Sequence, residues 1–155
     1  MQDGSVCVHV PSGDWRAIDH AIVRLALSKA EHDFEEARWL LAARRAAVHT
    51  RFGFATFAEY VERRLGHDRR TTADKLRVAE ALSGLPRLCE ALRTGALPWT
   101  AVREIVRVAV SETEGEWLVA TLGKAVREIE GMVSGRRPGD RPSDPLRSDS
   151  GGDVA

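Results

Sequence analysis

The sequence predicts an all-α fold, in which one long N-terminal helix is followed by a bundle of short helices containing a helix-turn-helix-like unit. Between Trp15 and Phe52 the chain has neither Gly nor Pro and is rich in Ala, Leu, Arg and Glu, which favour helix. After Gly53, recurring Gly and Pro residues divide the chain into short segments with helical apolar spacing. The 155 residues are enough for one domain with its own core.

The long helix is predicted to run from Trp15 to about Phe52, with Asp14 as its N-cap. A helix of that length spans roughly 50 Å, whereas a domain of this size has a radius of gyration of only about 15 Å. We therefore expect that it either breaks near His32 or packs against a second copy, and we favour a homodimer. The seam is heptad-like, with Arg44 as its one polar rung, and consists of Val23, Leu27, Ala30, Phe34, Ala37, Leu41 and Val48.

The short helices are predicted from their capping residues. Thr56 and Glu59 form a capping-box pattern at the start of a helix that ends at Leu65, and Asp68 can cap the next one. The remaining helices are predicted from Pro, Ser and Gly residues, which mark most of their starts and ends. The later helices are expected at residues 69–82, 86–94, 98–110, 111–122 and 124–133.

The two ends of the chain are predicted to lie outside the domain. Residues 1–14 are expected to be a flexible arm, residues 15–134 the all-α domain, and residues 135–155 a disordered linker or tail rich in Pro, Gly, Ser and Asp. The sequence lacks a signal-peptide pattern and an apolar run long enough to span a membrane. The cysteines, Cys7 and Cys89, form no CxxC pair, so a cytoplasmic location is expected.

Charge is unevenly distributed along the chain. The formal net charge is zero, which counts against a strong nucleic-acid binder. Residues 51–110 nevertheless carry 11 basic and 7 acidic residues, whereas the segments on either side are net negative. Within this basic segment, a short helix at 59–65, a turn containing Gly66 and a second helix at 69–82 follow the order of a helix-turn-helix.

The start of the second helix is the candidate DNA-binding surface. Ala73, Leu76, Ala79 and Leu82 would face the core, while the basic first turns would point outward toward phosphates and base edges. Basic residues at the end of the preceding helix would add contacts to the DNA backbone. The candidate residues are Arg63, Arg64, Arg69, Arg70, Thr71, Lys75 and Arg77. The alternative, which the even charge balance favours, is a protein-protein interaction or dimerisation module without direct DNA contact.

Residues 31–142 resemble the N-terminal domain of bacterial HNH-endonuclease-like proteins. The resemblance rests on EEARWLLAARRAAVHTRFGFATFAEYVERRLG and KLRVAEALSGLPRLCEALRTGALPWTAVREIVRVAV, followed by ETEGEWL and VREIEGMVSGRRPGDRP. It implies an all-α domain, often joined by a Pro- and Asp-rich linker to a small HNH nuclease domain. The segment from RRTTADKLRVAEAL to GALPWTAVREIV is also similar to the helix-turn-helix region of plasmid-partition proteins. A DNA-binding accessory module, with double-stranded DNA as its partner, is therefore expected.

No catalytic or metal-binding residue is assigned. An HNH site needs a His that activates water and further His or Asn ligands for a divalent ion, but the five histidines are scattered along the chain. His32 and Glu36 could share a cation on one helix face, although a charged surface is the simpler interpretation. Trp39, Trp99 and Trp117 are expected to anchor the core. No cofactor is expected.

Overall fold

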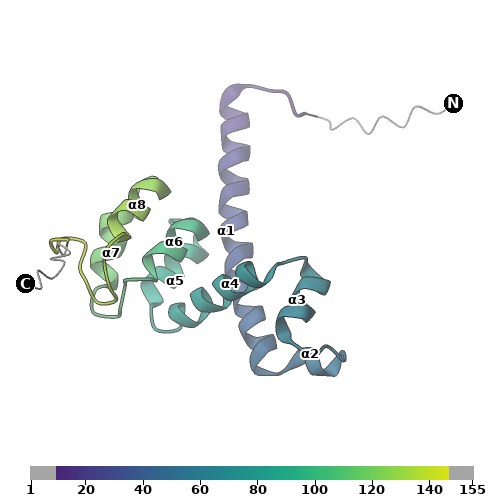
Figure 1. The fold of residues 1–155 in the computed structure, drawn as a ribbon. Coiled ribbons are helices and arrows are strands. Elements are labelled where there is room, and N and C mark those ends of the chain that lie inside the picture. Colours follow the sequence, from purple (N-terminus) through teal and green to yellow (C-terminus); the bar gives the residue numbers. More distant parts are fainter. Residues whose placement is uncertain (1–9, 147–155) are drawn as a thin grey trace, which may run out of the picture.

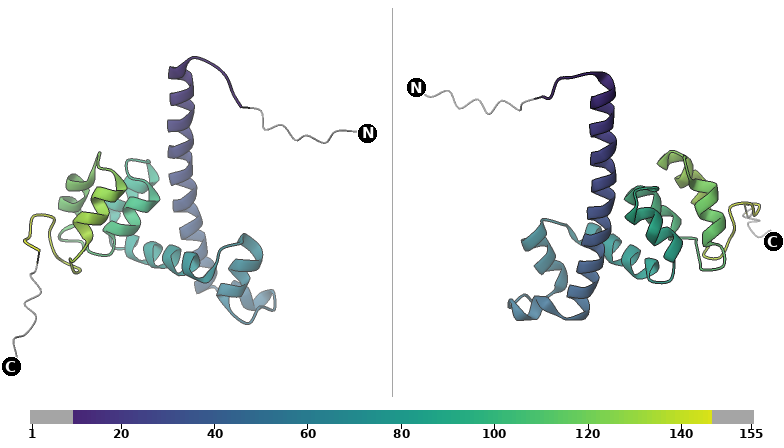
Figure 2. Two further views of the ribbon diagram at one scale, coloured as in Figure 1. Left: turned by 45° about the horizontal axis from the view of Figure 1, so that its top comes forward. Right: turned by 180° about the vertical axis from the view of Figure 1, so that it is seen from behind.

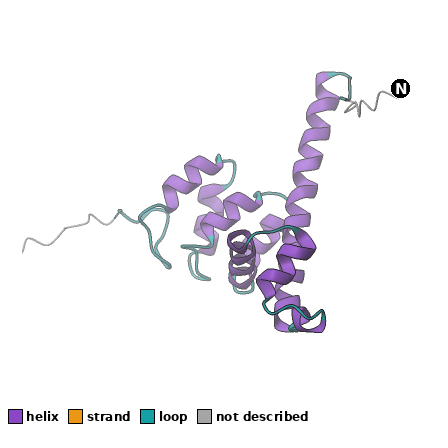
Figure 3. Ribbon diagram, turned by 45° about the vertical axis from the view of Figure 1, so that its right-hand side comes forward, coloured by secondary structure: helices purple, strands orange, loops and turns teal. Residues whose placement is uncertain are grey.

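The computed structural model describes residues 10–146, which form eight helices joined by loops and turns and contain no strand (Figure 3). The N-terminal end of the long helix α1 projects beyond all the other helices (Figure 1). This confirms the all-α prediction with a long first helix. The helices are α1 (Trp15–Arg45), α2 (Val48–Arg51), α3 (Phe57–Leu65), α4 (Arg69–Leu82), α5 (Pro86–Arg93), α6 (Trp99–Ile105), α7 (Glu114–Thr121) and α8 (Val126–Val133).

Helix α1 continues through His32 without a break, so the predicted alternative of two helices is wrong. It ends at Arg45, seven residues before the predicted end, because Ala47 adopts a left-handed backbone conformation with φ of 49°. Val48 therefore belongs to α2 and does not extend the seam. Only the C-terminal part of the predicted seam is packed against the domain. Val23 and Leu27 are exposed, whereas the residues further along α1 are buried, namely Ala30, Phe34, Ala37 and Leu41.

Helix α4 crosses the lower half of α1 and takes part in two apolar clusters (Figure 2). Val78 and Leu82 join the larger cluster, which includes residues of α1 and of α5 to α8. Leu76 and Ala79 join the smaller cluster, with residues of α1 and α3. Trp99 packs against both clusters. Because α4 has apolar neighbours on two sides, only a narrow strip of its surface remains open.

The helix-turn-helix-like unit lies at the predicted bounds because its signals are local. The Thr56 hydroxyl accepts a hydrogen bond from the N–H of Glu59 at 3.1 Å and caps α3. The Asp68 carboxylate accepts one from the N–H of Thr71 at 2.7 Å and caps α4. Between the two helices, Gly66 has φ of 71°, a conformation that glycine adopts without strain. The turn is therefore determined by these short-range contacts.

The later helices are shorter than the sequence predicts. Helix α6 ends at Ile105, and α7 begins at Glu114 and not at Ser111. The segment between them is a turn in which the N–H of Val110 donates to the hydroxyl of Thr113 at 3.1 Å. Among the tryptophans, Trp117 is fully buried, as expected for a core anchor, whereas Trp39 is 70 % exposed and does not anchor the core.

Residues 135–146 form an irregular segment that is hydrogen-bonded to itself and to the domain, although the sequence predicts a tail from residue 135. The Arg136 guanidinium donates to the backbone oxygens of Arg141, Pro142 and Asp144 at 2.7–2.8 Å. The indole N–H of Trp117 donates to the backbone oxygen of Asp140 at 2.9 Å. Residues 1–9 of the predicted arm and residues 147–155 of the predicted tail lie outside the described residues.

Candidate nucleic-acid interface

The open strip of α4 carries the basic side chains on which the DNA-binding prediction depends. Its exposed residues are Arg69, Arg70, Ala73, Arg77 and Glu80, whereas its buried residues are Thr72, Lys75, Leu76, Val78, Ala79 and Leu82. The prediction that Ala73 faces the core is therefore wrong, and Val78 occupies the core instead. The helical period of 3.6 places residues three and four apart on one face, so Arg70 and Arg77 share this strip.

The strip borders a groove of about 590 Å³ between α4 and the end of α6, which we call the α4–α6 groove. Four guanidinium groups and two carboxylates surround it, so its lining has an excess of two positive charges. The lining residues are Arg70, Asp74 and Arg77 from α4, and Arg103, Glu104, Val106 and Arg107 from α6 and the turn that follows.

The carboxylates hold three of the arginines at the groove and leave the fourth without an ion pair. The buried Glu104 accepts from Arg103 Nε at 3.2 Å and from Arg107 Nη1 at 3.0 Å. Arg77 Nη2 lies 3.4 Å from an oxygen of Asp74. Arg70 is exposed and forms no ion pair within residues 10–146. Because a guanidinium has five N–H donors, even the paired arginines keep donors for a phosphate.

Lys75 is not part of this surface, so its assignment as a DNA contact is wrong. The residue is only 6 % exposed. Its Nζ lies 2.5 Å from an oxygen of Glu36 and 3.2 Å from one of Asp33, both on α1. It also lies 4.8 Å from the centroid of the Trp99 ring, a cation–π contact. The carboxylates of Asp33 and Glu36, about forty residues earlier in the sequence, therefore hold the Lys75 side chain inside the protein.

A histidine and a second lysine complete the charge cluster around Lys75. His67 Nε2 lies 2.6 Å from the other oxygen of Glu36, and Lys29 Nζ lies 2.8 Å from Asp33. Burial disfavours the charged form of Glu36, but hydrogen bonds from Lys75 and His67 outweigh it and hold its pKa below the ordinary value. The two oxygens of Glu36 thus bind side chains of the protein. No metal-binding group of three or more His, Cys, Asp or Glu residues occurs among residues 10–146.

The remaining candidates lie beside the α4–α6 groove or on a different helix. Arg69 is exposed at the start of α4 but does not line the groove, and Thr71 is half-buried. Arg63 and Arg64 are exposed on α3, where the guanidinium of Arg64 stacks on the Phe52 ring, 4.3 Å from its centroid. They are therefore at most flanking contacts.

The groove brings together Arg70 and Arg77, which the sequence identifies, and Arg103 and Arg107, which it does not. These last two residues are four apart on a predicted helix and therefore share a face. That spacing is a usable signal, although only the fold shows that this face adjoins α4.

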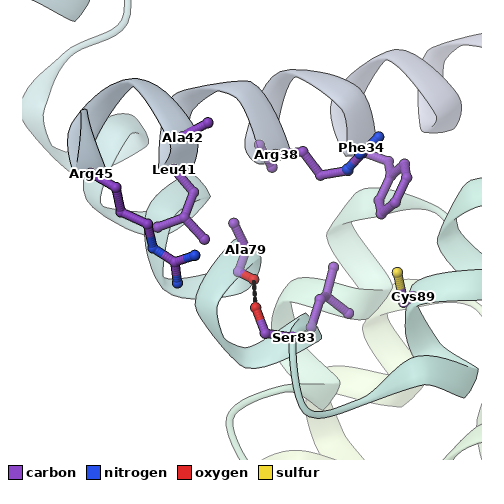
Figure 4. Close-up of a pocket in the computed structure, with 10 residues that line it drawn as sticks. Phe34, Arg38, Leu41, Ala42, Arg45, Ala79, Ser83 and Cys89 are labelled. Carbon is purple, nitrogen blue, oxygen red and sulfur yellow. Dashed lines mark hydrogen bonds between the residues drawn. The ribbon is translucent and has the colours of Figure 1, made fainter. Parts of the chain in front are cut away.

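A second groove, of about 290 Å³, separates α1 from α4 and α5 and is mostly apolar (Figure 4). In this view Leu41 of α1 lies opposite Ala79 of α4, and Arg45 reaches over the opening. Cys89 lies at one end of the groove, where burial raises the pKa of its thiol. A thiol with a raised pKa stays protonated at neutral pH and is a poor nucleophile. The geometry does not support cysteine chemistry here.

Comparison of the chain with protein-family models, curated proteins and solved structures found no match. No helix among residues 10–146 combines the length and apolarity that crossing a membrane requires.

Proposed function

We propose that this chain is a non-catalytic, DNA-binding helical module of an HNH-endonuclease-like protein and that the α4–α6 groove binds the backbone of double-stranded DNA. The observation that carries the DNA-binding part is the convergence of four arginines on one groove, where Arg70 is exposed and forms no ion pair within 4.0 Å among residues 10–146. Hydrogen bonds from Thr71 hold the pKa of Asp68 below its ordinary value, and the charge of Arg70 contributes to the same shift. Phosphate contacts of this kind supply most of the affinity of sequence-independent binding. The link to HNH-like proteins rests on the sequence resemblance.

The burial of α4 favours backbone contacts over the reading of bases. A recognition helix places several side chains in the major groove, but α4 offers only its narrow open strip. Acidic groups also lie in that strip or beside it, because Glu80 is exposed and Asp74 lines the α4–α6 groove. We therefore expect weak binding with little sequence preference and a strong dependence on salt.

The test is a salt titration of binding to a labelled DNA duplex. Replacement of Arg70 and Arg107 by Ala should reduce the log–log salt slope by about 1.8, because each lost phosphate contact removes about 0.9. Both side chains are exposed, so folding should be retained. The control is Arg127→Ala, which removes an exposed arginine on α8 that does not line the groove. An unchanged slope and affinity in the double variant would exclude the groove as the binding site.

A protein-interaction module without DNA contact is the second candidate. It is favoured by the exposed apolar side chains on the projecting half of α1, among them Trp15, Ile22 and Leu25. A gel shift at low salt separates the two candidates: the absence of a shifted band would support the interaction module and contradict the DNA-binding proposal. In either case, incubation of the chain with Mg²⁺ and plasmid should produce no cleavage.

A further inference from the structure

The first half of α1 packs little against the described part of the chain: none of residues 15–29 is buried, although Leu27 lies beside Gly95. The first buried residue of the helix is Ala30, and the N-terminal turns of α1 rise beyond the domain (Figures 1 and 2). Residues 15–29 continue a helix that is packed from Ala30 onward, so they need no separate nucleation. The large apolar side chains that they expose are what favours a covering surface.

Four of the exposed apolar residues form a regular seam, whereas the exposed Val23 and Leu27 lie on the face that Ala30 and Phe34 continue. Trp15, Ile18, Ile22 and Leu25 follow one another at steps of three, four and three, and each is between 41 and 68 % exposed. These steps are the a and d spacing of a two-helix coiled coil. The seam that packs on the domain lies on another face, which includes Ala30 and Phe34.

We propose that this seam, Trp15–Ile18–Ile22–Leu25, is the interface of an antiparallel homodimer in which the α1 helices of two copies pair over residues 15–25. Trp15 then packs against Leu25 of the partner subunit, and Ile18 packs against Ile22 of the partner subunit. This inference does not depend on DNA binding, since no residue of the seam lines the α4–α6 groove.

The antiparallel direction follows from what covers the next part of the same face. Trp15, Ile22, Lys29 and Glu36 are seven residues apart and lie on one line of the helix. On that line Glu36 is bound to His67, in the turn between α3 and α4, at 2.6 Å. Two parallel helices would bring both copies of this turn to the same place at the same level. Antiparallel helices place the two domains at opposite ends.

The area and charge of the seam fit a second copy of the chain. Each large apolar side chain removes about 100 Å² from water, so four from each copy, with flanking alanines, bury about 1,000 Å² in total. This area lies at the lower end of specific interfaces and implies a dimer that dissociates on dilution. Residues 15–29 carry three basic residues and one acidic residue, a net charge of +2 in each copy. Arg16 and Arg24 lie on the side of the helix away from the seam, so these two charges do not face the partner subunit.

The first experiment measures the mass of the full chain by sedimentation equilibrium between about 1 and 200 µM. Wild type should dimerise reversibly, and Ile22→Glu combined with Leu25→Glu should raise the dissociation constant at least tenfold. The control is Val119→Glu, at a residue of α7 that is 76 % exposed, which should dimerise like wild type. Circular dichroism checks that all variants fold. A wild type that stays monomeric, or a double variant that still dimerises, would overturn the proposal, because another segment or partner would then cover the seam.

The second experiment tests the direction by disulfide cross-linking, with Cys7 and Cys89 replaced by Ser. In the antiparallel dimer the two copies of residue 15 are ten residues apart along the axis, about 15 Å, which is too far for a disulfide. A mixture of Trp15→Cys and Leu25→Cys chains should therefore cross-link under mild oxidation, whereas each alone should not. Cross-linking of either variant with itself would show a parallel pair and refute this geometry.

Discussion

Replacement of Lys75 by Met tests whether this lysine is an internal cation, as the structure shows, or a surface group. The substitution keeps an unbranched apolar side chain but leaves Asp33 and Glu36 without their shared partner. Breaking a buried ion pair from one side costs about 3–5 kcal/mol. Here Asp33 keeps Lys29 at 2.8 Å and Glu36 keeps His67 at 2.6 Å. We therefore expect a smaller loss of unfolding free energy, about 2–3 kcal/mol.

The assay is urea unfolding at pH 7, followed by circular dichroism. The matched control is Lys124→Met, the same substitution at an exposed lysine, which should change the unfolding free energy by less than about 0.5 kcal/mol. Adding Glu36→Gln to Lys75→Met should recover about 1 kcal/mol, because the unpaired charge is then removed. Equal stability of the two Met variants would refute the buried position of Lys75 and return it to the candidate DNA-binding surface.

The stabilities of wild type and of Lys75→Met should respond differently to acid. Because the folded-state pKa of Glu36 lies below its ordinary value of 4.5, this carboxylate stabilises the fold above that pH. The contribution is lost as the pH falls through the lower, folded-state pKa. In Lys75→Met the burial of Glu36 remains but the cation is gone, so its pKa rises. The stability gap between wild type and variant should therefore be full at pH 7 and shrink below about pH 4.5.

Three further predictions test other parts of the fold. Gly95→Ala should cost about 2–3 kcal/mol in thermal unfolding, because φ is +77° and the new methyl would clash with Leu27 Cδ2 and lie 3.3 Å from the Leu27 Cα. Gly123→Ala, at φ +75° in open space, should cost only about 1 kcal/mol, and equal losses would contradict the close approach to α1. Thr56→Ala should cost about 1 kcal/mol by removing the cap of α3, measured by urea unfolding, whereas Thr56→Gly should cost less. Arg136→Ala should make residues 137–146 more sensitive to limited proteolysis by removing the hydrogen bonds to their backbone oxygens, and an unchanged digestion pattern would show that other contacts hold the segment.

The parts of the fold that the sequence predicts well are those with short-range causes. The bounds of α3 and α4 follow from Thr56, Gly66 and Asp68, each of which acts within four residues of its own position. The end of α1 was mispredicted because no Gly or Pro marks it. Its last turn is followed by Ala47 at positive φ, a conformation that alanine adopts rarely. Sequence alone gives little reason to place a helix end there.

The orientation of α4 depends on residues far away in the sequence. Helical periodicity places the Arg70 and Lys75 side chains on different faces of α4, because five residues correspond to about 1.4 turns, or about 140° around the axis. It does not say which of the two faces inward. The carboxylates of Asp33 and Glu36 decide this, because they can pair with an inward lysine. The same long-range packing buries Val78 and exposes Ala73. Local patterns contain no information about such a partner.

The burial of Lys75 also changes what the charge of residues 51–110 means for binding. A count of charges treats every basic residue of that segment as available to DNA. Lys75 is not available, because it is paired with Asp33 and Glu36 of α1 inside the protein. The groove retains four arginines, so its contacts alone allow a log–log salt slope no steeper than about −3.6. A measured slope well beyond that value would require flanking residues such as Arg63 or Arg69 to bind phosphate too. A slope near −0.9 would mean that Glu104 and Asp74 keep their three arginines when DNA is bound, so that Arg70 alone binds phosphate.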